Sequence, residues 1–215
     1  MDVLALYEGC LRTWLDRVPA VPADRWQAPT PSAGRTVREL VNHVVLDDLW
    51  SIPLLEGALP SEIAGLLEGD VLGDDPLAAA DAVGAVALSS VRLNLPDGGI
   101  VFLPTGVEDC EDYVRRLAAH HLIHAWDLAT ALGADPGLDP VLVRAVSAWF
   151  SFVPRPRRAA RLIDADPEEG DAVSVLLAQF GRDPAWSADR SPSARIAVLE
   201  ASTASSSHLG MSLPT

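Results

Sequence analysis

Three of the five histidines in the chain lie between residues 120 and 124. In a helix, His120 and His124 are one turn apart on the same face, with about 5–6 Å between their Cβ atoms. One helix could therefore offer two imidazole nitrogens to a single divalent ion, as the H-E-x-x-H helix of zinc proteases does. The glutamate of that protease motif is absent here, so the spacing indicates a metal site of another kind.

The helical stripe that carries these two histidines is otherwise apolar or aromatic. It consists of Tyr113, Leu117, His120, His124 and Leu128. Such a stripe predicts a buried face, and a buried imidazole needs a partner for each nitrogen. A metal ion could supply that partner, but so could a neighbouring carbonyl in an ordinary core, and the spacing leaves both open. His121 lies off the stripe and is predicted to face solvent or to support the site from behind.

A zinc-like site needs at least a third protein ligand, and a neighbouring helix is the natural source. His43 is the only histidine in the first half of the chain, on a helix predicted to follow the capping box of residues 36–39. Asn42 and Asp47 are candidate partners beside it, with a solvated face as the alternative. Asp127 lies one turn past His124 and could orient its imidazole or face the site.

Helical spacing recurs along most of the chain, whereas strand-like alternation is almost confined to residues 100–103. The predicted helices span residues 2–18, 37 to about 53, 76 to about 93, 107–132, 140–150 and 172–180, and Pro53 is expected to kink or end the second. The pattern predicts an all-α fold with four main helices, antiparallel or nearly so.

The composition narrows the possible partners. The chain has 215 residues, is 49% hydrophobic, and carries 16 basic against 30 acidic residues, a formal net charge of −14. Such a charge repels a phosphate backbone, so we expect no nucleic acid and no membrane partner, and a small-molecule substrate or another protein instead. The expected oligomeric state is a monomer or homodimer. A local basic patch, Arg155 to Arg161, could meet a substrate carboxylate, but a solvated face is the favoured interpretation.

Cysteine use and hydropathy predict a cytoplasmic protein. Cys10 and Cys110 match no disulfide framework and are expected to be buried, inert thiols in a reducing compartment. Neither a signal peptide nor a run of eighteen apolar residues is apparent.

Three motifs resemble one known family. They are Thr36 to His43 (TVRELVNH), His124 to Ala129 (HAWDLA) and Gly181 to Trp186 (GRDPAW). In this order they resemble the DinB-like superfamily, specifically its actinobacterial branch named after mycothiol-dependent maleylpyruvate isomerase. The resemblance covers residues 1–187 and leaves residues 188–215 as a predicted flexible tail. It implies a DinB-like four-helix bundle, with additional short helices at the C-terminal side, that binds a divalent metal through His43, His120 and His124.

The chain departs from this branch at three positions. The branch commonly has an acidic residue where His120 stands, and often Cys and Trp where Ser32 and Arg35 stand. A three-histidine set is more like the wider superfamily and leaves the metal open, with zinc first and nickel or iron as alternatives. The two loop replacements indicate a changed entrance beside the second helix, which puts the maleylpyruvate substrate in doubt.

The resemblance implies a metal-dependent isomerase or thiol transferase. It would use mycothiol, or a related small thiol, for isomerisation, addition or S-transfer on a small electrophile, with Asp127 as the assisting catalytic residue and Trp50 lining the cofactor pocket. Two alternatives remain open on the sequence: a thiol-independent enzyme of specialised metabolism, and a non-catalytic small-molecule-binding protein. A thiol-dependent turnover assay separates them.

Overall fold

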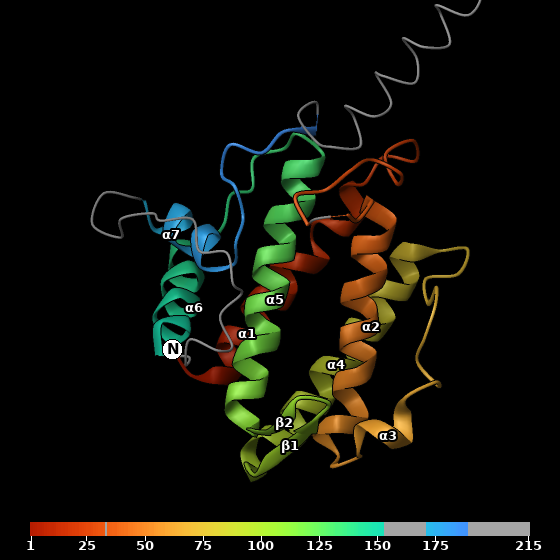
Figure 1. Ribbon diagram of the computed structural model, residues 1–215, viewed down its shortest axis with the longest axis vertical. Helices are drawn as coiled ribbons and strands as arrows, with labels where there is room; N and C mark the ends of the chain where they lie inside the picture. The colour runs from red at the N-terminus through yellow and green to blue at the C-terminus, as the bar shows by residue number, and fades with distance from the viewer. Residues whose placement is uncertain (33, 153–170, 189–215) are drawn as a thin grey trace, which may run out of the picture.

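The computed structural model describes residues 1–32, 34–152 and 171–188. This part of the chain is mostly helical, with one small antiparallel sheet (Figure 1), and the predicted all-α fold class is confirmed. The helices are α1 (Val3–Leu15), α2 (Val37–Leu55), the one-turn α3 (Pro60–Ile63), α4 (Pro76–Asn94), α5 (Cys110–Ala131), α6 (Pro140–Phe152) and α7 (Ala172–Gln179). Short 3-10 turns, η1 (Val18–Ala20) and η2 (Leu95–Asp97), follow α1 and α4.

Several helix starts lie where the sequence predicted them. Asp2 caps α1 by accepting a hydrogen bond from the amide of Ala5 at 2.8 Å. The capping box at α2 is complete: the amide of Thr36 donates to Glu39 at 2.7 Å, and the amide of Glu39 donates to Thr36 Oγ1 at 3.3 Å. Such caps satisfy amides that the first helical turn leaves without partners, so they fix where α2 begins.

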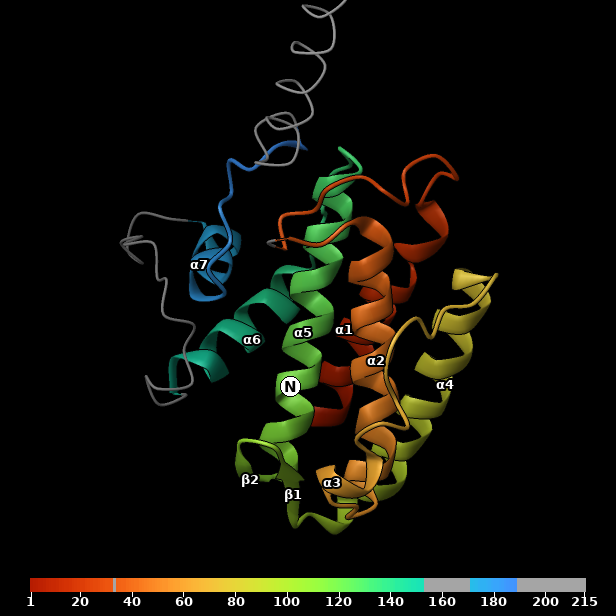
Figure 2. The ribbon, with the colours of Figure 1, turned by 45° about the vertical axis from the view of Figure 1, so that its right-hand side comes forward.

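The four long helices α1, α2, α4 and α5 pack against one another around the main core. Helix α1 packs on α5 and α4, and α2 packs on α4 and α5. Figures 1 and 2 show α2 and α5 side by side, with α5 rising from the sheet while α2 descends toward α3. The largest fully buried side chains include Trp14, Tyr7, Leu40, Leu122 and Leu128. This packing places one side of α2 next to one side of α5.

The structure has a small sheet that the sequence did not predict. Residues 100–103, whose alternation fitted either a short strand or an extended segment, form β1 (Ile100–Leu103), and β2 (Gly106–Asp109) pairs with it antiparallel, with Phe102 opposite Val107. The start predicted for α5, at residue 107, was wrong, because Asp109 caps that helix by accepting from the amide of Glu111 at 2.9 Å. Gly106, the first residue of β2 after the turn, has φ +128°, a conformation that most side chains would strain.

Helix ends were predicted less well than helix starts. Helix α1 ends at Leu15 rather than at residue 18, and Pro19 instead lies within η1. Pro53 does not end α2, which continues to Leu55. A proline this close to the end of a helix removes only one backbone hydrogen bond, so the last turn tolerates it.

One described segment, Pro76–Asp97, is long and apolar enough to cross a membrane by length and composition alone, with a mean hydropathy of 1.3. It corresponds to α4 and η2, and α4 packs on α2 and α1. The residues that α4 buries are mostly small, among them Ala80, Gly84 and Ala87. A core helix passes the same test, so this finding leaves the predicted absence of a membrane partner untested.

The C-terminal side carries two further helices. Helix α6 packs on α5 and α1, and α7 packs on α6. The predicted arginine patch, Arg155 to Arg161, and the predicted tail beyond residue 188 lie outside the described residues.

Candidate functional site

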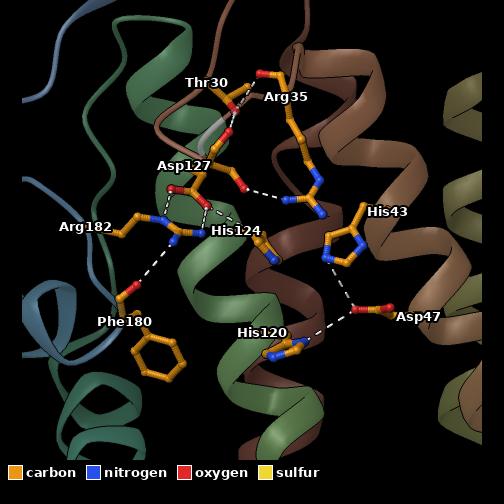
Figure 3. Close-up of polar contacts among 10 residues, drawn as sticks. Thr30, Arg35, His43, Asp47, His120, His124, Asp127, Phe180 and Arg182 are labelled. Carbon is orange, nitrogen blue, oxygen red and sulfur yellow. Dashed lines mark hydrogen bonds and ion pairs between the residues drawn. The ribbon is translucent and has the colours of Figure 1, made fainter. Parts of the chain in front are cut away.

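Three histidines from two helices face the same region between α2 and α5 (Figure 3). The ring centroid of His124 lies 5.4 Å from that of His43 and 6.0 Å from that of His120. The helical repeat places His120 and His124 on one side of α5, and the packing of α2 brings His43 opposite them. Residues 43 and 124, distant in sequence, therefore meet in space.

A carboxylate lies at the more open side of this histidine trio. Asp47, one turn after His43 on α2, approaches His43 Nε2 at 3.7 Å and His120 Nδ1 at 3.4 Å. Burial alone would raise the pKa of Asp47, but the hydrogen bond and charges of the histidines outweigh it, and the pKa is lowered. Asp47 is therefore ionised at neutral pH.

His124 is held from behind by a buried ion pair. Its Nδ1 lies 2.9 Å from Asp127, and Arg182 donates to the same carboxylate from Nε and Nη2, each at 2.7 Å. Asp127 is fully buried and His124 is 5% exposed. A carboxylate acceptor at Nδ1 favours the tautomer whose Nε2 lone pair is free. Asp127 thus orients His124, one of the two roles expected for it.

The two better-shielded histidines are neutral at physiological pH. Burial lowers the pKa of His124 to about 4, although Asp127 opposes the shift. Burial also lowers the pKa of His43, with Asp47 opposing and the positive charge of Arg35 reinforcing the shift. Neutral imidazoles can accept a hydrogen bond or ligate a metal through a lone pair.

Sequence analysis did not identify Arg182 as a site residue. It lies in the segment after α7, 55 positions from Asp127 in sequence, yet it reaches the carboxylate behind His124 (Figure 3). The available signal was its place in the GRDPAW motif, together with the need of a buried aspartate for a cation. Nothing in the sequence said which arginine would meet that need.

Arg35 was noted only as a departure from the family. It immediately precedes the cap of α2, and Figure 3 shows its side chain extending toward His43. Its Nη1 donates to Ser32 Oγ at 3.2 Å. A guanidinium therefore stands beside the histidine trio.

For two residues, the structure excludes one of the two expected positions. His121 does not face solvent: it is 2% exposed, its Nε2 lies 2.9 Å from Asp48, and its ring packs edge-on against Tyr7. The reason is that α5 is covered by α1 as well as by α2, so its buried face is wider than one stripe. Asn42 does not support the histidines, because its amide group binds the loop backbone at Gly69 and Val71, at 2.8 Å each.

His120 is less buried than the stripe predicted, since a third of its side chain is exposed. Trp50 is half-buried on α2, and its Nε1 donates to the carbonyl of Leu67 at 3.3 Å. Its predicted place in a cofactor pocket stays a prediction. A cavity of about 360 Å³ does open beside His43, lined by Arg38, Glu39, Asn42, His43, Leu46 and Asp70.

The residue types of the histidine trio suit a divalent ion, and His43 and His124 are held neutral. Two imidazoles on one tetrahedral zinc ion have ring centroids about 5 Å apart, given Zn–N distances of about 2 Å, close to the 5.4 Å between His43 and His124. In the described ranges, no three His, Cys, Asp or Glu side chains already surround one point as ligands. Binding of an ion would therefore require the three imidazoles to move closer together around one point.

Comparisons with known proteins give distant relatives. No protein-family model matches the chain. Two uncharacterized proteins, from two strains of Mycobacterium tuberculosis, are each 27% identical over 191 residues, which is 85% of this chain and 98% of the relative. The crystal structure of a mutant of mycothiol-dependent maleylpyruvate isomerase matches 69% of this chain and 68% of its own, at 17% identity and a TM-score of 0.46. Similarity at this level neither establishes a family nor transfers an activity.

Proposed function

We propose that the chain is a divalent-metal-dependent enzyme that acts on a small electrophile with mycothiol, or a related small thiol, as co-substrate. The observation that carries the proposal is the meeting of His43, His120 and His124 around one region, with His124 fixed by Asp127. Histidine-rich sites suit zinc, nickel and iron, and zinc is our first candidate. Mycothiol enters through the sequence motifs that resemble the isomerase branch.

In this proposal the histidine trio holds the ion, and two carboxylates position the imidazoles. Asp127 accepts from His124 Nδ1, which leaves Nε2 free for the ion. Asp47, at 3.4 Å from His120 Nδ1, orients that ring in the same way. At least one coordination position stays open for a thiol or solvent, as catalytic sites require.

We further propose that α1, α2, α4 and α5 are a DinB-like four-helix bundle within a domain of residues 1–187. Support comes from the mutual packing of these helices and from the opposite directions of α2 and α5. Metal sites in such bundles are built from side chains on facing helices, which matches the distribution of the histidine trio.

The nucleophile in this proposal comes from outside the chain. Both cysteines are buried, and burial raises the pKa of Cys10 to about 12 and also raises that of Cys110. A buried thiol with a raised pKa is a poor nucleophile. A bound divalent ion lowers the pKa of a thiol that it coordinates, so a small diffusible thiol meets the requirement.

Asp47 and Asp127 have different roles in this scheme. The carboxylate of Asp47 is a third exposed and ionised, so it is suited to accept a proton from a thiol or substrate that enters the site. Asp127 is fully buried and acts only through His124. We propose that Trp50 lines the part of the pocket that takes the non-reacting portion of the thiol.

Two reaction types are compatible with this site. In an isomerisation the thiolate adds to a conjugated double bond. The carbon–carbon bond that was double is then single and can rotate, and elimination restores the double bond and returns the same thiolate. In a transfer the thiolate displaces a leaving group and is consumed. The amount of free thiol after turnover therefore distinguishes the two, while turnover without thiol would favour the thiol-independent enzyme.

Calorimetric titration of mycothiol into metal-loaded protein tests the proposal. Binding is expected for the wild type and for His208→Ala, which removes a histidine outside the described residues. Binding should be lost in His120→Ala, because an incomplete ligand set holds the ion poorly. Absence of mycothiol binding to the metal-loaded wild type would contradict a thiol-using enzyme.

A further inference from the structure

Arg35 has no carboxylate partner in the described part of the chain, although it stands at the candidate site. Its one side-chain hydrogen bond there runs from Nη1 to Ser32 Oγ, at 3.2 Å. The Nε and Nη2 groups, which together can bind both oxygens of one carboxylate, have no acceptor among the described residues. The side chain is only half-exposed.

Four other arginines in the described ranges have this same fork filled. In each case both Nε and Nη2 approach one carboxylate within 3.1 Å: Arg38 with Asp70, Arg92 with Glu8, Arg116 with Glu108, and Arg182 with Asp127. Arg35 differs from these four because its fork is empty and its side chain extends toward His43 of the histidine trio.

The loop holds the backbone of Arg35 in place. The carbonyl of Arg35 accepts from both the amide and Oγ1 of Thr30, each at 3.0 Å, and its amide donates to the carbonyl of Ser32 at 3.1 Å. Thr30 is 5% exposed and Ser32 is 2% exposed. A binding group fixed before the ligand arrives loses less entropy on binding.

No described carboxylate forms an ion pair with Arg35. Hydrogen bonds from Thr36 lower the pKa of Glu39, and the charge of Arg35 adds to this shift, but that carboxylate is held in the capping box by the amide and hydroxyl of Thr36, at 2.7 and 3.0 Å. The same capping box occupies the start of α2, so the helix end is not an alternative anion receptor. The guanidinium instead extends toward His43 (Figure 3), whose pKa its charge helps to lower.

We propose that Arg35 binds a carboxylate of the small substrate through Nε and Nη2. Its planar fork can pair with two oxygens of a carboxylate or of a phosphate, and titration with inorganic phosphate separates the two. A carboxylate held there leaves the rest of a small molecule beside the histidine trio. This inference rests on the proposed function and names its substrate class: small organic acids.

The test uses titrations of the full-length protein, in metal-free and metal-loaded form, followed by the imidazole NMR signal of His43. The probes are succinate, its neutral analogue succinamide, and inorganic phosphate, at fixed pH and ionic strength. The variants are Arg35→Gln, Arg35→Lys and the matched control Arg92→Gln, which removes an arginine whose fork is already filled by Glu8. Circular dichroism checks that each variant is folded.

Succinate should shift the His43 signal saturably in the wild type and in Arg92→Gln, and succinamide should not. In Arg35→Gln the dissociation constant should rise at least about tenfold, with partial recovery in Arg35→Lys, which keeps the charge but loses the fork. The proposal is overturned if the wild type does not bind succinate, if Arg35→Gln binds it equally well, or if phosphate binds and succinate does not. Metal content, measured on the same samples, tests the proposed metal site. The titration of the metal-free protein tests the role of Arg35, because it does not require a bound ion.

Discussion

At the scale of single residues, the site depends on one buried relay, Arg182 to Asp127 to His124. A carboxylate behind a ligating imidazole fixes its tautomer and direction, and loss of such a partner typically weakens metal binding about 10–100-fold. Each hydrogen bond in this relay is 2.9 Å or shorter. The imidazole of His124 is therefore aimed before any ligand binds.

The first prediction concerns Asp127→Asn. This variant removes the negative charge that both His124 and Arg182 contact, so zinc affinity should fall by about 10–100-fold. Competition with a chromophoric chelator measures the affinity. The control is Asp81→Asn, at an exposed position on α4, which should bind zinc as tightly as the wild type does. Equal zinc affinity in the two variants would show that Asp127 does not act through His124.

The second prediction concerns pH and follows from the buried state of His124. Its pKa is about 4 in the folded protein against a usual 6.5, so the unfolded chain binds more protons between these values. The free energy of unfolding of the metal-free protein should therefore fall as pH drops from 6.5 toward 4, by up to about 3 kcal/mol from this residue.

Urea unfolding across this pH range tests the second prediction. His124→Gln lacks the titrating group, so its stability should fall less on acidification than that of the wild type. Acidic residues contribute to the pH dependence of the unfolding free energy in both proteins, so their contributions cancel when the two are compared. Parallel slopes would rule out a strongly lowered pKa for His124.

At the scale of elements, the sequence correctly predicted the features that depend on residues close together in the chain. The caps at Asp2 and Thr36 and the stripe of α5 depend on residues a few positions apart. Strand β2 was missed because four residues carry little periodicity and their pairing with β1 is a contact between segments. His121 was misplaced because the width of a buried face depends on how many helices cover it.

The third prediction concerns the buried contact between α2 and α5. Asp48 and His121 are each 2% exposed in their side chains and lie 2.9 Å apart. Asp48→Ala leaves the imidazole buried without its partner and should cost about 3 kcal/mol of unfolding free energy. Asp48→Asn keeps an oxygen acceptor and should cost less. Denaturant unfolding measures both, and equal losses would mean that the hydrogen bond contributes nothing.

At the scale of the whole molecule, the relay connects the C-terminal segment to the main core. Arg182 follows α7, whereas Asp127 belongs to α5. The sequence could not predict this contact, because the pairing of a buried aspartate with one of many arginines is decided by the fold. The meeting of His43 with the α5 histidines was suggested by the need for a third ligand and by the family resemblance, whereas the spacing of these residues in the sequence could not predict it.

The fourth prediction concerns Arg182→Gln. Loss of the two short hydrogen bonds to Asp127 should release the segment after α7, so amide hydrogen exchange in α7 should quicken while exchange in α4 stays unchanged. Mass spectrometry of peptides from both helices measures this. Unchanged exchange in α7 would mean that the relay does not tie the C-terminal segment to α5.

The central claim is that His43, His120 and His124 hold one divalent ion, and metal content measured by inductively coupled plasma mass spectrometry tests it most directly. Protein loaded with zinc and then desalted should retain about one ion per chain in the wild type and in His208→Ala. Each single alanine variant of the trio should retain much less, because two imidazoles hold zinc weakly. Full metal content in His124→Ala, or none in the wild type, would contradict the site.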